Sequence, residues 1–272
     1  MSSRKVVKLF PALTQQEGVG ATVHRTIGRR EMSVLDPFLL LDEFQLARGA
    51  GGFPDHPHRG FETVTYMFSG KMQHADNKGG GGVIGPGDAQ WMTAGSGLVH
   101  SEMPISERGE DVHGMQLWVN LPASDKMKKP AYRDVTADNL VVIEEEGAEI
   151  RLIAGEYKGQ KGPVAGVQLN PVYMDIHMQA DSQVTLDIPR GHTAFVYPVS
   201  GSVKIGAQTV ARRTLAVLGQ GDQVTLKAQE DNRLIVAASA PTGEPVARYG
   251  PFVMNTESEI RQAIDDFNRG KF

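Results

Sequence analysis

Two histidines separated by a single residue, His56 and His58, lie in the segment DHPHRGFETV at residues 55–64. In an extended strand, residues i and i+2 point to the same face, so both imidazoles can reach one point in space. Pro57 fixes its own φ and favours an extended conformation at His56. The segment is therefore either a pair of surface histidines or half of a metal site, carried on a strand.

A second pair with the same spacing, His100 and Glu102, lies in GLVHSEMP at residues 97–104. Three neutral imidazoles and one carboxylate suit divalent first-row metals such as Fe, Mn, Co, Ni, Cu or Zn. Four protein ligands in a six-coordinate shell leave two positions for a chelating substrate, or for a substrate and dioxygen. A single pair of this kind is explained by solvent-exposed residues of a hairpin that bind nothing. Two pairs with same-face spacing favour a metal site instead. We predict that His56, His58, His100 and Glu102 are its ligands.

The composition sets limits on other functions. The 272 residues carry a net charge of −4 and contain no cysteine, which excludes disulfides and cysteine-based zinc sites. Acidic and basic residues are mixed along the chain, so direct binding of nucleic acid is not expected. The sequence has no apolar run long enough for a membrane span and no signal-peptide pattern at its start, so we expect a cytoplasmic protein.

The elements that must position these side chains are strands. Short segments rich in β-branched and aromatic residues alternate with Gly, Pro, Asp and Asn, which is typical of a sandwich or barrel. One helix is expected at the C-terminus, because Thr256 and Glu259 form a capping-box pattern ahead of apolar residues with helical spacing, and Gly270 follows.

The chain also contains an internal repeat. TVTYMFSGKM (63–72) aligns with AFVYPVSGSV (194–203), and a Gly-Asp pair follows each segment, ending at Asp88 and at Asp222. The two halves therefore read as copies of one β unit. We place the boundary where the composition becomes charged and polar, giving domains at 1–135 and 136–272.

The repeat sharpens the prediction of the metal site. When the alignment of the two repeated segments is extended towards the N-terminus, His56 and His58 correspond to Asp187 and Pro189, and Glu62 corresponds to Thr193. When the two Gly-Asp pairs are aligned with each other, His100 and Glu102 correspond to Leu234 and Val236. No histidine is kept, so we expect a polar site in the first half and a packed, metal-free copy in the second.

Four segments in the same order resemble the pirin family of the cupin superfamily: DHPHRGFETVTYMFSG, GDAQWMTAGSGLVHSEMP, GMQLWVNLP and GEPVARYGPFVMNT. The resemblance implies an all-β bicupin, with two cupin-type β-barrel or jelly-roll domains, a metal in the first only, and a short C-terminal helix. It also implies that the four ligands are those named above and that the metal is iron(II). In the general cupin motif the residue at Glu62 binds the metal, but here we assign Glu62 to hydrogen bonding with a ligand imidazole.

The resemblance further implies quercetin 2,3-dioxygenase activity, in which a flavonol and O₂ react with ring opening and loss of carbon monoxide. Glu102 is then the expected catalytic base for the flavonol hydroxyl. The alternative is an iron-binding, redox-sensitive regulator that acts through protein partners without turnover; the resemblance suggests it because animal members of the family act as nuclear cofactors of transcription. A roomy apolar pocket at the metal favours the enzyme, whereas a filled pocket beside a charged patch favours the regulator.

Overall fold

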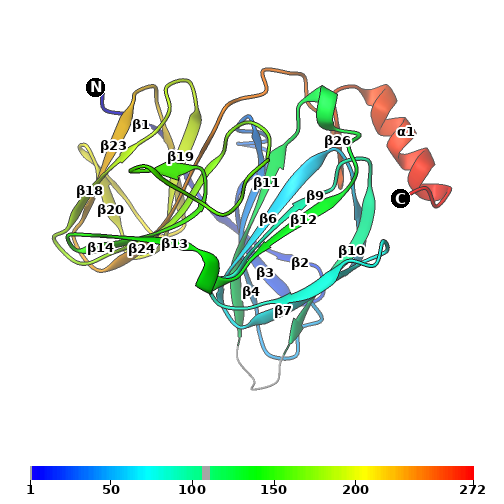
Figure 1. Cartoon of the computed structure of the whole chain (residues 1–272), viewed down its shortest axis with the longest axis horizontal. Helices are drawn as coiled ribbons and strands as arrows, with labels where there is room; N and C mark the ends of the chain where they lie inside the picture. Colours follow the sequence, from blue (N-terminus) through cyan, green and yellow to red (C-terminus); the bar gives the residue numbers. More distant parts are fainter. Residues whose placement is uncertain (1, 106–110) are drawn as a thin grey trace. The chain divides into compact units, whose positions relative to one another are not determined.

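Short antiparallel strands make up most of the chain, as its many turn residues predict. The computed structural model describes residues 2–105 and 111–272 (Figure 1). Contacts divide the chain into two units. The first unit contains Thr14–Ala137 and Thr242–Phe272, and the second contains the residues up to Leu13 together with Asp138–Pro241.

These units differ from the predicted domains at the two ends of the chain. The break near residue 137 lies close to the predicted boundary, but each terminal segment belongs to the other half. The N-terminal strand pairs with Thr214–Leu218 in the second unit, and the C-terminal helix contacts Phe252–Met254 in the first. The reason is that strand pairing and helix packing act over long sequence separations, which composition does not reveal.

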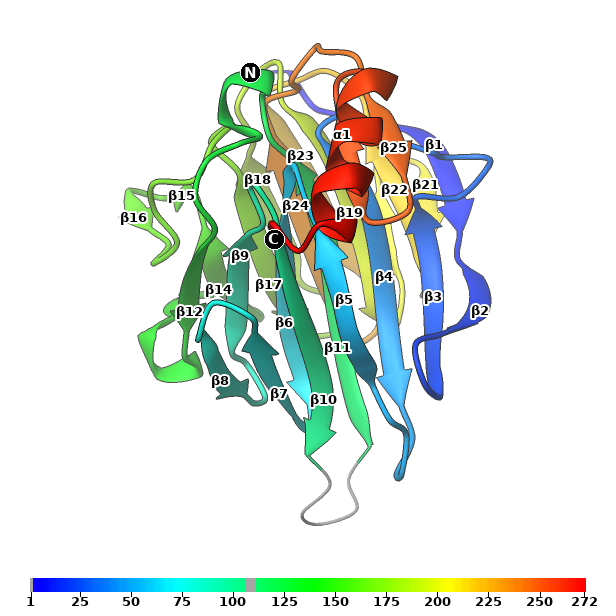
Figure 2. The ribbon, with the colours of Figure 1, turned by 90° about the vertical axis from the view of Figure 1, so that its right-hand side faces the viewer.

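The first unit contains two sheets that face each other in a cupin arrangement. The larger has the order β12-β9-β6-β11-β4-β3-β2, and the smaller has the order β5-β10-β7-β8 (Figure 2). The strands are β2 (Leu13–Glu17), β3 (Ala21–Ile27), β4 (Phe38–Leu46), β5 (Phe53–His58), β6 (Phe61–Ser69), β7 (Lys71–Asp76), β8 (Gly81–Ile84), β9 (Ala89–Thr93), β10 (Leu98–Ile105), β11 (Val112–Asn120) and β12 (Ala131–Val135).

The second unit repeats this topology. Its sheets have the orders β1-β22-β19-β24-β17-β14-β13 and β18-β23-β20-β21, and β15 pairs with β16. The strands are β1 (Val6–Pro11), β13 (Val141–Glu145), β14 (Ala148–Ala154), β15 (Glu156–Tyr157), β16 (Gln160–Lys161), β17 (Val172–Met178), β18 (Gln183–Asp187), β19 (Thr193–Ser200), β20 (Val203–Ile205), β21 (Gln208–Val210), β22 (Thr214–Leu218), β23 (Gln223–Ala228) and β24 (Asn232–Ser239).

The matching sheet orders support the predicted duplication but correct its register. The strand in the place of β10 is β23, because each pairs with the strand in the place of β5. His100 pairs with His56, and Val224 pairs with Leu186. Leu234 and Val236, the predicted counterparts of His100 and Glu102, lie instead on β24, which corresponds to β11. The alignment of the two Gly-Asp pairs was wrong because one pair precedes β9 and the other precedes β23, and these strands do not correspond to each other.

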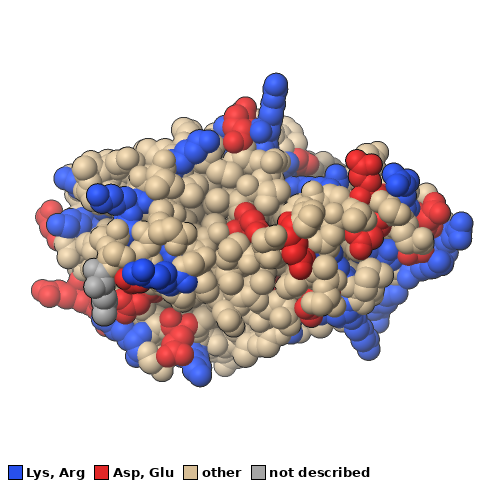
Figure 3. All heavy atoms as spheres, turned by 90° about the horizontal axis from the view of Figure 1, so that it is seen from above, with Lys and Arg blue, Asp and Glu red and all other residues tan. Residues whose placement is uncertain are grey.

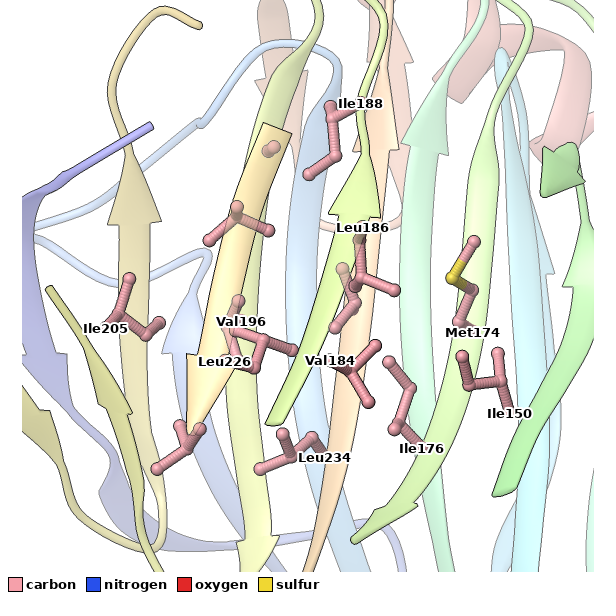
Figure 4. Close-up of a cluster of buried hydrophobic side chains, with 14 of the residues drawn as sticks. Ile150, Met174, Ile176, Val184, Leu186, Ile188, Val196, Ile205, Leu226 and Leu234 are labelled. Carbon is pink, nitrogen blue, oxygen red and sulfur yellow. The ribbon is translucent and has the colours of Figure 1, made fainter. Parts of the chain in front are cut away.

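The true counterparts of the four site residues are all apolar. They are Leu186, Ile188, Val224 and Leu226, which belong to the buried core of the second unit (Figure 4 labels Leu186, Ile188 and Leu226). The prediction of Asp187 and Pro189 was displaced by one residue. The alignment was displaced because the two connections differ in length: β18 and β19 are joined by residues 188–192, whereas β5 and β6 are joined by residues 59–60 alone. A shift of one residue in a strand assigns each side chain to the opposite face.

The predicted C-terminal helix is confirmed as α1 (Glu257–Asn268). Thr256 caps it and forms a capping box with Glu259, and Ile260 and Ala263 are buried. It contacts the hairpin of β25 (Ala247–Tyr249) and β26 (Phe252–Met254). Among the described residues, no helix has the length and apolar character needed to cross a bilayer. On the face shown in Figure 3, acidic and basic side chains are interspersed.

Candidate metal centre

Three of the predicted ligands converge between neighbouring strands of the smaller sheet. His56 on β5 is directly opposite His100 on β10, and His58 follows on the same face of β5. The ring centroids are 4.5 Å apart for His56 and His100, 4.7 Å for His56 and His58, and 5.0 Å for His58 and His100. One nitrogen from each ring lies within 4.8 Å of the other two, a spacing that can hold a single ion.

The hydrogen bonding of these rings fits a metal. The Nδ1 of His56 bonds to the carbonyl of Pro54 at 2.8 Å, which orients the ring and leaves Nε2 for a ligand. Nδ1 of His58 and both nitrogens of His100 are buried and have no hydrogen-bond partner among residues 2–105 and 111–272. Buried polar atoms are nearly always satisfied, so a group of orphaned imidazole nitrogens is accounted for by an ion that binds them.

Burial also holds the imidazoles in the form that binds metal. Desolvation, together with the neighbouring His100 and His56, lowers the pKa of His58 well below its usual value. Desolvation likewise lowers the pKa of His100 to about 4, although Glu102 acts in the opposite direction. Both rings are therefore neutral at pH 7, and a metal would not have to displace protons from them.

The fourth predicted ligand, Glu102, lies beside the three histidines but outside their group of mutually close nitrogens. Its carboxylate accepts hydrogen bonds from Thr65 Oγ1 at 3.1 Å and from Gln116 Nε2 at 3.2 and 3.1 Å. The register between β10 and β5 shifts between His100 and Glu102, and such irregularities can re-aim a side chain next to a site. Glu102 therefore shares the interior with the histidines and is held by two donors from the larger sheet.

A cavity of about 370 Å³ opens onto this group. His56, His58 and Glu102 form one part of its lining, and much of the rest is apolar or aromatic. The apolar part includes Val23, Leu40, Phe44, Phe53 and Trp118, and the charged residues other than Glu102 are Glu17, Arg25, Asp42 and Arg248. Trp118 meets the ring of His58 edge to face, with the centroids 5.1 Å apart. The space is large enough for a planar aromatic molecule.

Glu62 does not have the role predicted for it. The β6–β11 pairing is regular from Phe61 to Tyr66, so Glu62 and Thr65 point to opposite faces. Because Thr65 reaches Glu102 in the interior, Glu62 faces away, where it accepts hydrogen bonds from Trp91 Nε1 at 2.9 Å and Thr93 Oγ1 at 2.6 Å. The alternation of side chains along β5, which ends at His58, does not continue through the turn at residues 59–60 into β6.

Sequence reasoning missed Gln116, Thr65 and Arg248 as residues of the cavity and its supports. Gln116 and Trp118 alternate along β11, a pattern that could have indicated a shared face. Arg248 lies far away in the sequence and gives no such local signal.

Comparison with known proteins matches residues 20–119 to the pirin domain and residues 173–272 to the pirin C-terminal cupin domain. The chain is 46% identical to human Pirin, covering 99% of this chain and 94% of that protein. Its structure resembles quercetin 2,3-dioxygenase from Acinetobacter baumannii, with a TM-score of 0.94, 37% identity and coverage of 100% and 99% of the two chains. The bacterial pirin YhhW from Escherichia coli, solved with nickel(II), shares the fold with a TM-score of 0.71, 19% identity and coverage of 86% and 99%.

Proposed function

This chain belongs to the pirin family, and we propose that it is a metal-dependent dioxygenase that cleaves flavonols such as quercetin with O₂. The observation that carries the proposal is a cluster of three imidazoles, two of them with orphaned nitrogens, beside an aromatic-lined cavity. The resemblance to the Acinetobacter dioxygenase supports the same reading. The fold itself is the predicted all-β bicupin with one short C-terminal helix.

We propose that His56, His58 and His100 bind the metal and that Glu102 is the fourth ligand. Iron(II) is the proposed ion, and the same donor set suits Mn, Co, Ni, Cu and Zn. A bound divalent ion would supply Lewis acidity that favours the ionised form of a flavonol hydroxyl. The protein contributes the orientation of each ring, as the Pro54 carbonyl does for His56.

The remaining steps belong to the side chains of the cavity. Phe44, Phe53 and Trp118 provide surfaces against which a planar substrate can pack and exclude water. Glu102 accepts the proton of the substrate hydroxyl. Thr65 and Gln116 hold its carboxylate in place by hydrogen bonds, so the base is preorganised and loses little freedom when the substrate binds.

The test is oxygen uptake by iron-loaded protein with quercetin, combined with elemental analysis of each variant. His58→Ala should lose both metal and turnover. Glu102→Gln should keep metal bound by the three imidazoles and lose turnover by about 10²-fold or more, as expected for removal of a general base. Glu62→Gln is the matched control, because it removes a buried carboxylate on the opposite strand face and should keep both properties.

The absence of oxygen uptake with several flavonols and several metals would refute the dioxygenase proposal and leave the redox-sensitive regulator. That alternative uses the same ligands, so the ligands do not distinguish the two functions. The size and aromatic lining of the cavity support the enzyme, because a regulator needs no space for a substrate at the metal.

A further inference from the structure

We infer that Arg248 forms an anion subsite in the wall of this cavity and selects aromatic substrates that carry an anionic oxygen group remote from the metal. The inference rests on the proposed function in one respect: it assumes that the cavity beside the histidines is the substrate site. It goes further by assigning a charge to the substrate and a residue that recognises it.

Arg248 is fixed in the wall by contacts on both sides. Its guanidinium lies 4.9 Å from the centroid of the Trp118 ring, and Nη1 donates to the carbonyl of Leu39 at 3.0 Å. The indole of Trp118 in turn contacts His58 edge to face. One aromatic ring therefore separates the cation from the histidine cluster, and both can be reached by a single ligand spanning the cavity.

Among the described residues, no carboxylate is hydrogen-bonded to Arg248, although the charge of Asp42 acts on it from a distance. The other cation, Arg25, is bound by Asp42 through two hydrogen bonds, at 2.8 and 2.7 Å, and by Glu17 at 3.1 Å. The carboxylates of Asp42 and Glu17 are thus engaged by Arg25. Within residues 2–105 and 111–272, Arg248 makes hydrogen bonds only to backbone carbonyls and forms no ion pair.

An unpaired guanidinium in this position is unfavourable until an anion arrives. Burial and the positive charge of Arg25 lower the pKa of Arg248 although the charge of Asp42 opposes them, but a guanidinium remains protonated at neutral pH. Its bonds to Leu39 and Gly250 use two of five N–H donors, so others are available to a ligand. A carboxylate or ionised phenol would form charge-assisted hydrogen bonds there.

The neighbouring surfaces determine the rest of the ligand. Phe44, Phe53 and Trp118 favour a flat aromatic body between the cation and the histidines. A neutral polar group would meet the guanidinium with weaker hydrogen bonds, and an apolar group would leave the charge uncompensated. The geometry therefore favours an aromatic anion over its neutral isostere.

The test compares two probes of the same shape, 6-hydroxy-2-naphthoate and 6-hydroxy-2-naphthamide, by isothermal titration calorimetry. Titrations use the full chain, both metal-free and loaded with redox-inert zinc, so no turnover is required. The wild-type protein should bind the carboxylate at least about tenfold more tightly than the amide, which corresponds to about 1.4 kcal/mol. Arg248→Gln should remove this preference by weakening the carboxylate at least about tenfold, with a much smaller loss for the amide, whose hydrogen bonds to the guanidinium are weaker.

Two further variants complete the design. Arg248→Lys keeps the charge but not the planar donor pair, and should retain only part of the preference. Arg261→Gln removes an exposed cation of α1 and should behave as wild type, which controls for net charge. Equal affinity of the wild-type protein for both probes would overturn the inference, as would a parallel loss of both probes in Arg248→Gln. If the preference depends on Arg248 but quercetin produces no oxygen uptake, the subsite stands and the dioxygenase proposal fails.

Discussion

Replacing His100 with leucine should stabilise the metal-free protein while abolishing its response to metal. His100 is 2% exposed, and neither of its ring nitrogens has a hydrogen-bond partner in the part of the chain that the structure describes. In the second unit the same position holds Val224, which is part of the apolar core. The first unit thus retains an unsatisfied imidazole where its duplicate packs a hydrocarbon side chain.

The magnitude follows from the desolvated nitrogens. A buried polar group without a partner costs about 1–3 kcal/mol, so His100→Leu should raise the free energy of unfolding of metal-free protein by about that amount at pH 7. For a unit of this size, each kcal/mol corresponds to roughly 2–4 °C in melting temperature. Thermal unfolding followed by circular dichroism, with chelator present, measures the shift.

The effect should grow at acid pH. The pKa of His100 is about 4 in the folded protein and 6.5 in the unfolded chain, so between these values the unfolded chain binds a proton that the folded protein does not. The free energy of unfolding therefore falls as the pH decreases through this window, by on the order of 3 kcal/mol from this group. His100→Leu removes this contribution, and its stability should depend less on pH between 6.5 and 4.

A matched control is His74→Leu. His74 is equally buried on the adjacent strand β7, but its ring forms a buried hydrogen bond with Gln90, so His74→Leu loses this bond and should destabilise the protein. Added metal should stabilise the wild type by mass action and leave His100→Leu unchanged. If His100→Leu destabilises the metal-free protein as much as His74→Leu does, the reasoning from orphaned nitrogens is refuted.

Two more perturbations address the support of the site and the second unit. Gln116→Leu removes the donor to both oxygens of Glu102 and should weaken metal affinity about 10–100-fold, measured by competition with a chromophoric chelator. The control variant Gln90→Leu should keep its metal affinity. Equal losses in the two variants would contradict a supporting role for Gln116. In the second unit, burial alone would raise the pKa of Asp175, but hydrogen bonds from His177 and Arg233 outweigh it and hold the pKa at about 2. This stabilisation is present above pH 3.8 and disappears as the pH falls through 2. In urea titrations, Asp175→Asn should therefore lower the free energy of unfolding by about 2 kcal/mol at pH 7 and by little at pH 2. An equal loss at both pH values would exclude the ionic contribution.

Local patterns in the sequence were sufficient to group the proposed ligands in two pairs and to place the helix. His56 and His58 share a face, as do His100 and Glu102, because side chains alternate with a period of two in any extended strand. The capping box at Thr256 depends only on contacts three residues apart, so it too could be predicted locally. The similar segments at 63–72 and 194–203 indicated a duplication, and the sheet orders agree with it.

The tertiary structure decided everything that crosses a turn or joins distant strands. Glu62 faces away from the site because the turn at residues 59–60 breaks the parity of β5, and no periodic pattern extends through such a turn. Gln116 and Arg248 reach the cavity from β11 and β25, whose positions depend on long-range pairing. A sequence specifies how side chains alternate within a strand, but the neighbour of that strand is fixed only when hydrogen bonding and burial select one partner for each edge and face.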